Sequence, residues 1–171
     1  MAHIVRLPSG VRYHIDVGFG GDGPTRPIPL VSGAAVPTLG THEARLLYDN
    51  ISKESQRKQK HWIYQCRNGV DKEWNSFYCY PDLEFFQEDF EVINRFAACE
   101  FLKREFIVAV KFIRSGEEGE ILHNQEALVH IPDGPDEVHI AGKIMLVNNE
   151  VKLNMGGETR VIESLDTKQL E

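Results

Sequence analysis

The 171-residue sequence contains no long apolar run and no close pair of cysteines, and both features define several classes of protein. Its longest apolar run, Phe106–Val110, is far below the ~20 residues that span a bilayer, so we expect no membrane partner. The first residues do not show the basic start and following apolar stretch of a secretory signal, so we expect none. The three cysteines form no CxxC pair, which argues against a disulfide framework and favours a reducing compartment, the cytoplasm.

An excess of positive charge is also missing. The chain has 19 Lys and Arg against 26 Asp and Glu, a formal net charge of -7. A nucleic-acid-binding surface needs a net basic face, so we expect no nucleic-acid partner. The densest basic stretch, Lys53–Lys60, is interpreted as a solvated loop. None of the histidines has the i, i+4 spacing of a helical zinc motif, and we expect no metal site.

Alternating side chains predict an antiparallel β structure in the first half of the chain. His3–Leu7 and Val11–Asp16 alternate around Pro8-Ser9-Gly10, which is typical of a β-hairpin. Residues 17–27 hold too many glycines and prolines for a regular element and predict a shaped loop. Further strand patterns occur at Glu43–Tyr48, His61–Cys66 and Trp74–Cys79. Residues 1–88 are therefore predicted to form a small barrel-like domain.

The hydrophobic period changes after residue 80. Pro81–Phe86 is interpreted as one helical turn, and Asp89 as the N-cap of a helix with Phe90, Ile93, Phe96 and Ala97 on one face. Strand patterns return at Phe106–Ile113, Ile121–Ile131, Glu137–Val147 and Val151–Asn154, with turns at Ser115-Gly116, Asp133-Gly134 and Asn148-Asn149. Ser164–Glu171 is interpreted as the start of a helix. The predicted class is α/β, mainly β, with residues 89–171 forming a linking helix and an incomplete C-terminal subdomain.

Asp16 is the first candidate functional residue. It ends a strand and opens a glycine-rich loop, where a rigid scaffold presents side chains; the alternative is an Asx-type turn. Pairing across the hairpin places Ala2 opposite Asp16 and Ile4 opposite His14, with His3 on the other face. The diagonal neighbour of Asp16 would then lie immediately before the first residue of the sequence. His14 shares the face of Asp16 and is interpreted as a surface strand residue.

An aromatic side chain stands between two glycines at Gly18-Phe19-Gly20. The stretch is not a phosphate-binding loop, because it lacks GxGxxG spacing, a following helix and a nearby Lys-Ser/Thr. Since the glycine backbone lets a ligand approach closely, Phe19 is interpreted as a pocket wall.

The cysteines are interpreted as buried structural thiols. None of Cys66, Cys79 and Cys99 has the glycine-rich, helix-opening context that lowers the pKa of a thiol. The alternative is a thiol enzyme that pairs Cys66 or Cys79 with His14.

The segment Tyr13–Gly20, Y-H-I-D-V-G-F-G, and the G-P-T-R-P-I-P-L of Gly23–Leu30 resemble the arylamine N-acetyltransferase family, in particular its fungal branch. Phe77–Tyr80, Leu83–Phe85 and Asp89–Asn94 match the family in order and spacing. The resemblance covers nearly the whole chain, and D-V-G-F-G in this setting is specific. It implies a cysteine-protease-like transferase fold.

The resemblance also implies a reaction. Such enzymes use a Cys-His-Asp triad to move an acyl group from acetyl-CoA or another acyl-CoA, as co-substrate, to an aromatic amine or hydrazine, with ping-pong kinetics. Asp16 would be the triad aspartate, which accepts the imidazole N–H and fixes the tautomer and orientation of the histidine. Phe19 would contact the substrate, and Gly18 and Gly20 would shape the same wall. No metal takes part.

The sequence departs from the family pattern at its catalytic thiol. The family nucleophile lies in an R-G-G-x-C segment of an N-terminal helical domain, and the sequence contains no such segment. The family histidine would fall immediately before Met1, and Ala97–Leu102 also departs from the family. We therefore expect a truncated member that is inactive alone. The alternative is a non-catalytic binding or regulatory module, which could associate through the apolar surface left by the first domain.

Overall fold

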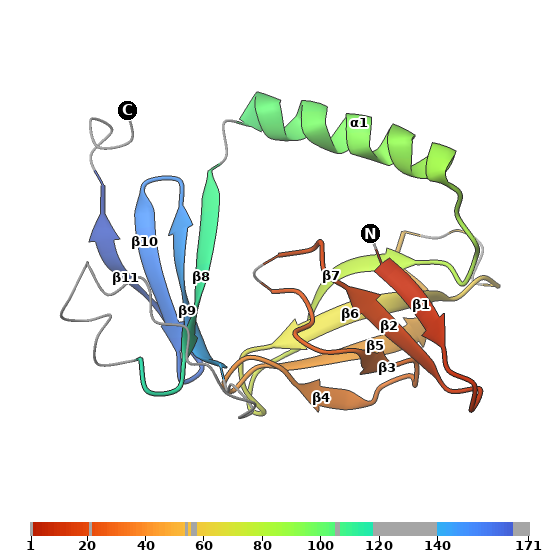
Figure 1. The fold of residues 1–171 in the computed structure, drawn as a ribbon, viewed down its shortest axis with the longest axis horizontal. Coiled ribbons are helices and arrows are strands. Elements are labelled where there is room, and N and C mark those ends of the chain that lie inside the picture. The colour runs from red at the N-terminus through yellow and green to blue at the C-terminus, as the bar shows by residue number, and fades with distance from the viewer. Residues whose placement is uncertain are drawn as a thin grey trace.

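The strands of the chain pair antiparallel into three sheets (Figure 1). The computed structural model describes residues 2–20, 22–53, 55, 58–104, 107–117 and 140–165, with the backbone alone at 101–104. These residues contain eleven strands and one helix, so the described part of the chain is mainly β, as predicted. The first half contains a three-stranded and a four-stranded sheet in place of one continuous barrel sheet.

The first sheet is built on the N-terminal hairpin. Its strands are β1 (Ala2–Arg6), β2 (Arg12–Asp16) and β3 (Ile28–Pro29), in the order β1-β2-β3. The register pairs Ala2 with Asp16 and Ile4 with His14, which confirms the predicted hairpin. Strand β3 was not predicted. It follows the glycine-rich loop and pairs Ile28 with His14, so the chain after the loop returns alongside the middle of β2.

The second sheet holds the main apolar core. It consists of β4 (Ala35–Pro37), β5 (Glu43–Asp49), β6 (His61–Arg67) and β7 (Asn75–Tyr80), in that order. The core cluster consists of Ile28, Ala44, Leu46, Trp62, Tyr64 and Cys66. Ala44 and Leu46 are buried while their neighbours are not, as the period of two requires. The described residues between β5 and β6 carry no regular element, as expected for the Lys53–Lys60 region.

The helix α1 (Gln87–Arg104) begins two residues before its predicted cap. Asp89 is its third residue, and its carboxylate accepts the backbone N–H of Phe86 at 2.9 Å, so Asp89 caps the helix from inside the first turn. The helical turn predicted at Pro81–Phe86 is wrong. That segment is connecting chain without regular structure, and Asp82 within it forms an ion pair with Arg12 of β2 at 2.9 Å.

The apolar residues in the middle of α1 are largely exposed. Val92 is 70% exposed, Ile93 55% and Phe96 69%. Figure 1 shows α1 running from the end of β7 to the start of β8, between the two β-rich parts of the molecule. The predicted helical period is therefore confirmed, but its apolar face does not form a core with the described residues.

The third sheet lies in the C-terminal part of the chain. It has the order β11-β10-β9-β8 and consists of β8 (Val108–Arg114), β9 (Ile140–Val147), β10 (Glu150–Met155) and β11 (Glu158–Ser164). The turns at Ser115-Gly116 and Asn148-Asn149 are confirmed. Strand β11 was not predicted. The expected strand at Ile121–Ile131, the turn at Asp133-Gly134 and most of the helix expected at Ser164–Glu171 lie outside the described residues.

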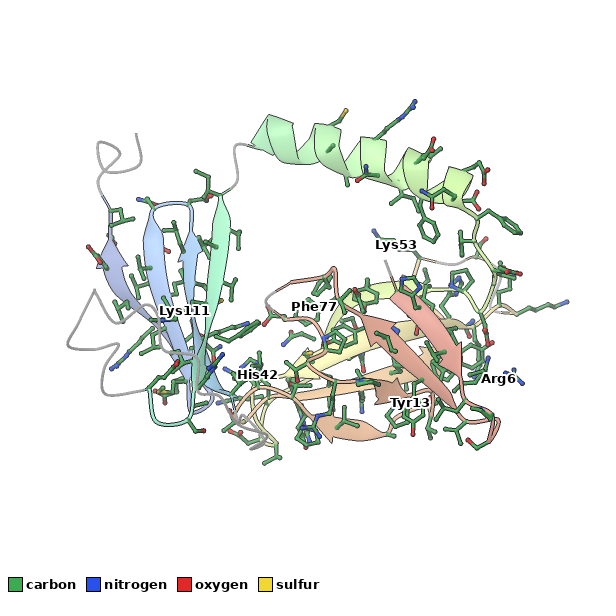
Figure 2. All side chains as sticks on the ribbon, in the orientation of Figure 1. Arg6, Tyr13, His42, Lys53, Phe77 and Lys111 are labelled. Carbon is green, nitrogen blue, oxygen red and sulfur yellow. The ribbon has the colours of Figure 1, made fainter. Side chains whose placement is uncertain are left out.

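The third sheet contacts the loops of the first two. His42, labelled in Figure 2, bonds Asn154 of β10 at 3.1 Å, and the backbone N–H of Gly40 donates to Ile140 at 2.9 Å. Gly40 has a φ of 52°, and a Cβ there would lie 2.6 Å from a β9 carbonyl oxygen, so this close approach requires glycine. The division into units 1–88 and 89–171 stays a prediction. In the described part of the chain, no helix is long and apolar enough to cross a membrane.

Candidate functional site

Asp16 lies at the end of β2 with its side chain turned inward. It is 6% exposed, and its Oδ1 accepts the backbone N–H of Gly18 at 2.9 Å. The Asx-type turn therefore exists, and it fixes one edge of the carboxylate. The Tyr78 hydroxyl also donates a hydrogen bond to Asp16. These two donors hold the buried Asp16 carboxylate in one orientation. A fixed carboxylate can in turn orient a side chain that donates a hydrogen bond to it.

His14 is buried, so its interpretation as a surface residue is wrong. It is 0% exposed because its face of β2 packs against tyrosines of β6 and β7, which sequence pairing within the hairpin does not reveal. Its Nε2 lies 3.0 Å from the Tyr78 hydroxyl and its Nδ1 lies 2.9 Å from the Tyr80 hydroxyl. Burial lowers the pKa of His14 to about 4, so the ring is neutral at pH 7.

Phe19 joins an aromatic cluster at the tip of the glycine-rich loop. Its ring lies 5.6 Å from Phe77, edge to face at 80°, and 5.0 Å from Tyr78. Tyr78 in turn stacks on Tyr64 with ring centroids 5.0 Å apart. Figure 2 shows Phe77 on the side of its sheet that faces this loop. Such aromatic pairs each contribute about 0.5–1.5 kcal/mol beyond their buried area, so the cluster fixes the loop on the sheet.

A cavity of about 830 Å³ opens beside Asp16 and Phe19. Its floor includes Gly18, Tyr78 and Tyr80, and its opposite wall comes from Phe85 and from residues of α1, including Phe90 and Ile93. The volume is that of a small-molecule site, and the lining combines five aromatic side chains with the buried Asp16 carboxylate. The structure thus brings together three of the four predicted site residues at one cavity: Asp16, Gly18 and Phe19.

Gly20 does not line the cavity. It has a φ of 85°, and its carbonyl accepts the N–H of Gly23 at 2.7 Å. Gly20 therefore closes the turn that presents Phe19, and its role as a direct substrate contact stays a prediction.

The cysteines do not match a reactive thiol. Cys66 is buried as predicted, donates to the Tyr64 hydroxyl at 3.0 Å, and has a pKa raised by burial to about 11. Cys79 and Cys99 are exposed, which corrects their interpretation as buried. Cys79 lies between Tyr78 and Tyr80 on β7 and lines the cavity, but among the described residues its thiol bonds no histidine that could remove its proton. Both ring nitrogens of His14 bond tyrosines, so His14 does not serve a thiol.

Thiol labelling is expected to separate Cys66 from Cys79. At pH 8 the raised pKa leaves Cys66 almost entirely protonated, so it should react roughly 100-fold more slowly than the exposed Cys79. Mass spectrometry after timed exposure to an alkylating reagent measures each rate, with Cys66→Ser as the control. Equal alkylation rates for Cys66 and Cys79 would contradict the interpretation of Cys66 as a buried, unreactive thiol.

The glycine-rich loop is tied to the third sheet by an ion pair that the sequence analysis missed. The ammonium of Lys143 on β9 is 2% exposed and bonds the Asp22 carboxylate. The Asp22 backbone oxygen also accepts the Tyr64 hydroxyl at 2.8 Å. The available signal was a lysine inside the apolar β9 run. Among the described residues, no group of three or more His, Cys, Asp or Glu side chains could hold a metal ion.

The structure matches an arylamine N-acetyltransferase from Salmonella typhimurium in its fold, with a TM-score of 0.55, covering 95% of this chain and 47% of that one at 24% identity. A model of the N-acetyltransferase family matches residues 1–151. The chain belongs to the arylamine N-acetyltransferase family.

Curated relatives match most of the chain. An N-malonyltransferase FDB2 of Gibberella moniliformis is 26% identical over 167 residues, which cover 92% of this chain and 43% of the relative. The N-malonyltransferase FDB2 of Fusarium pseudograminearum is 21% identical over 169 residues, with the same coverage of both chains. The chain therefore spans less than half the length of these relatives.

Proposed function

We propose that the protein takes part in acyl transfer from an acyl-CoA to an aromatic amine or hydrazine, and that this chain supplies Asp16 and the aromatic wall at Phe19. The observation that carries the proposal is the buried Asp16 carboxylate, fixed by Gly18 and Tyr78 at the edge of the cavity. The names of the two relatives favour malonyl-CoA over acetyl-CoA as the donor. The cytoplasm, where acyl-CoA is present, is the proposed location.

The chemistry assigns a definite task to Asp16. In the proposed reaction an imidazole removes the proton of a thiol, the thiolate attacks the thioester carbonyl, and CoA leaves as its thiol. The amine then attacks the acyl-enzyme and releases the thiol. Asp16 accepts the second imidazole N–H, which fixes the tautomer and stabilises the imidazolium that forms. Because Cys66 and His14 do not fit these roles, we propose that the thiol and imidazole come from polypeptide other than the described residues.

The experiment that tests the proposal uses two polypeptides. The 171-residue chain is assayed for malonyl and acetyl transfer to an aromatic amine, first alone and then co-expressed with the part of the Gibberella relative that it does not match. We expect no transfer by the chain alone and ping-pong transfer by the pair. Transfer by the chain alone would contradict the assignment of the thiol and imidazole to other polypeptide.

The aromatic wall predicts the effect of Phe19→Ala on amine binding. Loss of one aromatic contact should weaken the binding of an aromatic amine roughly threefold to tenfold. Calorimetric titration of the chain with the amine measures the change. Phe112→Ala on β8 is a matched control, because Phe112 is 41% exposed and Phe19 39%. Equal losses in the two variants would argue against Phe19 as a substrate contact.

The exposed face of α1 supports a second candidate, a non-catalytic module of the family that binds a polypeptide partner. Val92, Ile93 and Phe96 expose apolar surface that is typical of an interface. We expect the chain to self-associate in analytical ultracentrifugation, and Val92→Lys to restore the monomer. Val70→Lys is the matched control, with Val70 73% exposed and Val92 70%. A monomer without any substitution would contradict this use of α1.

A further inference from the structure

Four polar side chains form a continuous hydrogen-bonded series beneath the candidate site. The Tyr80 hydroxyl lies 2.9 Å from Nδ1 of His14, and Nε2 of His14 lies 3.0 Å from the Tyr78 hydroxyl. Tyr78 in turn bonds the Asp16 carboxylate. His14 is fully buried, and Asp16 is nearly so. The series therefore runs from the end of β7 through β2 to the carboxylate that faces the cavity.

The direction of every bond in the series follows from the carboxylate. An ionised carboxylate only accepts hydrogen bonds, so the Tyr78 hydroxyl donates its single proton to the hydrogen bond with Asp16. The oxygen of Tyr78 must then accept from His14, which requires a proton on Nε2. A neutral imidazole carries one N–H, so Nδ1 is an acceptor, and Tyr80 donates to it. One arrangement satisfies all four groups, and each bond in it points toward Asp16.

We propose that His14 is a positioning residue for Asp16: by donating its Nε2–H to Tyr78, it leaves the Tyr78 proton free for the carboxylate, and Tyr80 holds the imidazole in that tautomer. In the other tautomer, Tyr78 would donate to His14 and turn an oxygen lone pair toward Asp16. The relevance to catalysis rests on the proposed function, in which Asp16 orients the imidazole of the triad.

The surroundings of His14 support one stable tautomer. Its ring stacks on Tyr80 with centroids 5.4 Å apart and 13° between the planes, and on Tyr64 at 6.1 Å. Burial keeps the ring neutral, and it outweighs the opposite effect of the Asp16 charge on the pKa of His14. A neutral, stacked ring between two hydroxyls has no freedom to exchange its partners without breaking both bonds.

Nitrogen NMR of the 171-residue chain, labelled at histidine, tests the proposal directly. At pH 7 we expect the long-range proton–nitrogen pattern of the Nε2–H tautomer for His14. The Nδ1–H tautomer, or a protonated ring, would overturn the proposal. This readout needs no substitution and no catalytic activity, so a failure of the proposed function would leave its result intact.

Substitution of Asp16 provides the test of coupling. Asp16→Ala removes the acceptor for Tyr78, whose proton can then turn toward His14, so we expect a mixture of the two His14 tautomers. Asp16 does not bond His14, and a merely structural role would leave the tautomer unchanged. Asp49→Ala, at an exposed carboxylate on β5, is the control. An unchanged Nε2–H tautomer in folded Asp16→Ala would overturn the coupling.

Activity of the two-polypeptide enzyme separates positioning from packing. Tyr80→Phe, which keeps the ring and removes the donor to Nδ1, is expected to lower kcat severalfold with KM unchanged. His14→Gln, which keeps an amide N–H near the Nε2 position, should retain more activity than His14→Leu. Equal activity in the two folded His14 variants, or wild-type kcat in Tyr80→Phe, would overturn the proposal. If Asp16→Ala leaves kcat unchanged, the proposed function is wrong, whereas the hydrogen-bonded series is still tested by the His14 tautomer in the NMR experiment.

Discussion

Asp16→Ala is expected to lower acyl transfer by the two-polypeptide enzyme about 10⁴-fold, which is the loss in kcat found when a triad aspartate is replaced. The reason is geometric and electrostatic. The Asp16 side chain is buried and held by the N–H of Gly18 and the hydroxyl of Tyr78. A water molecule in the space left by the carboxylate carries no negative charge. The imidazole of the triad therefore loses both its orientation and the stabilisation of its charged form. Steady-state rates with malonyl-CoA and an aromatic amine measure the loss.

The control for this prediction separates catalysis from folding. Asp49→Ala removes a carboxylate of β5 that pairs loosely with Lys60, at 3.9 Å, and should retain wild-type activity. Thermal unfolding of both variants shows whether the chain remains folded. A loss of less than tenfold in a folded Asp16→Ala enzyme would contradict the role assigned to Asp16.

Asp22→Asn is expected to lower the free energy of unfolding by about 3 kcal/mol, the lower end of the range for breaking a buried ion pair. The reason is the burial of its partner. Lys143 is 2% exposed, so loss of the Asp22 charge removes a counter-ion from a buried ammonium. The Asp22 side chain is 41% exposed and can be hydrated when Lys143 is replaced. Lys143→Met should therefore cost less, because it removes the buried charge together with the pair.

Urea unfolding of the two variants measures this asymmetry. The amide introduced by Asp22→Asn has nearly the size of the carboxylate it replaces, so the comparison isolates the charge. The same experiments should show faster amide hydrogen exchange in the glycine-rich loop, since Asp22 ties that loop to β9. A larger loss for Lys143→Met than for Asp22→Asn would contradict this explanation.

The parts of the fold that sequence could predict are those set by local pattern. The alternation of the first sixteen residues and a tight turn fix the hairpin register, and the structure pairs Ala2 with Asp16 as expected. Strands β3 and β4 have only two and three residues, too few for a period to be recognised. Pro81–Phe86 resembles a helical turn in composition, but its geometry depends on the Asp82 contact with Arg12, 70 residues away.

The candidate site also contains residues that local sequence predicts and residues that it does not. Asp16 and Phe19 belong to one glycine-rich loop, and its local chemistry was enough to single them out. The partners of His14 lie 64 and 66 residues away, and Lys143 lies 121 residues from Asp22. No local pattern encodes such pairings, because they arise only when separate sheets pack together. The family resemblance assigned the role of Asp16, and the packing explains how its carboxylate is held.

The most direct test of the account is the location of the acyl group in the covalent intermediate. The chain and the unmatched part of the Gibberella relative are incubated together with malonyl-CoA in the absence of an amine, and each polypeptide is analysed by intact and peptide mass spectrometry. We predict a malonyl group on a cysteine of the relative's polypeptide, lost on addition of an aromatic amine, and none on this chain. A malonyl group on Cys66, Cys79 or Cys99 that passes to the amine would contradict the account.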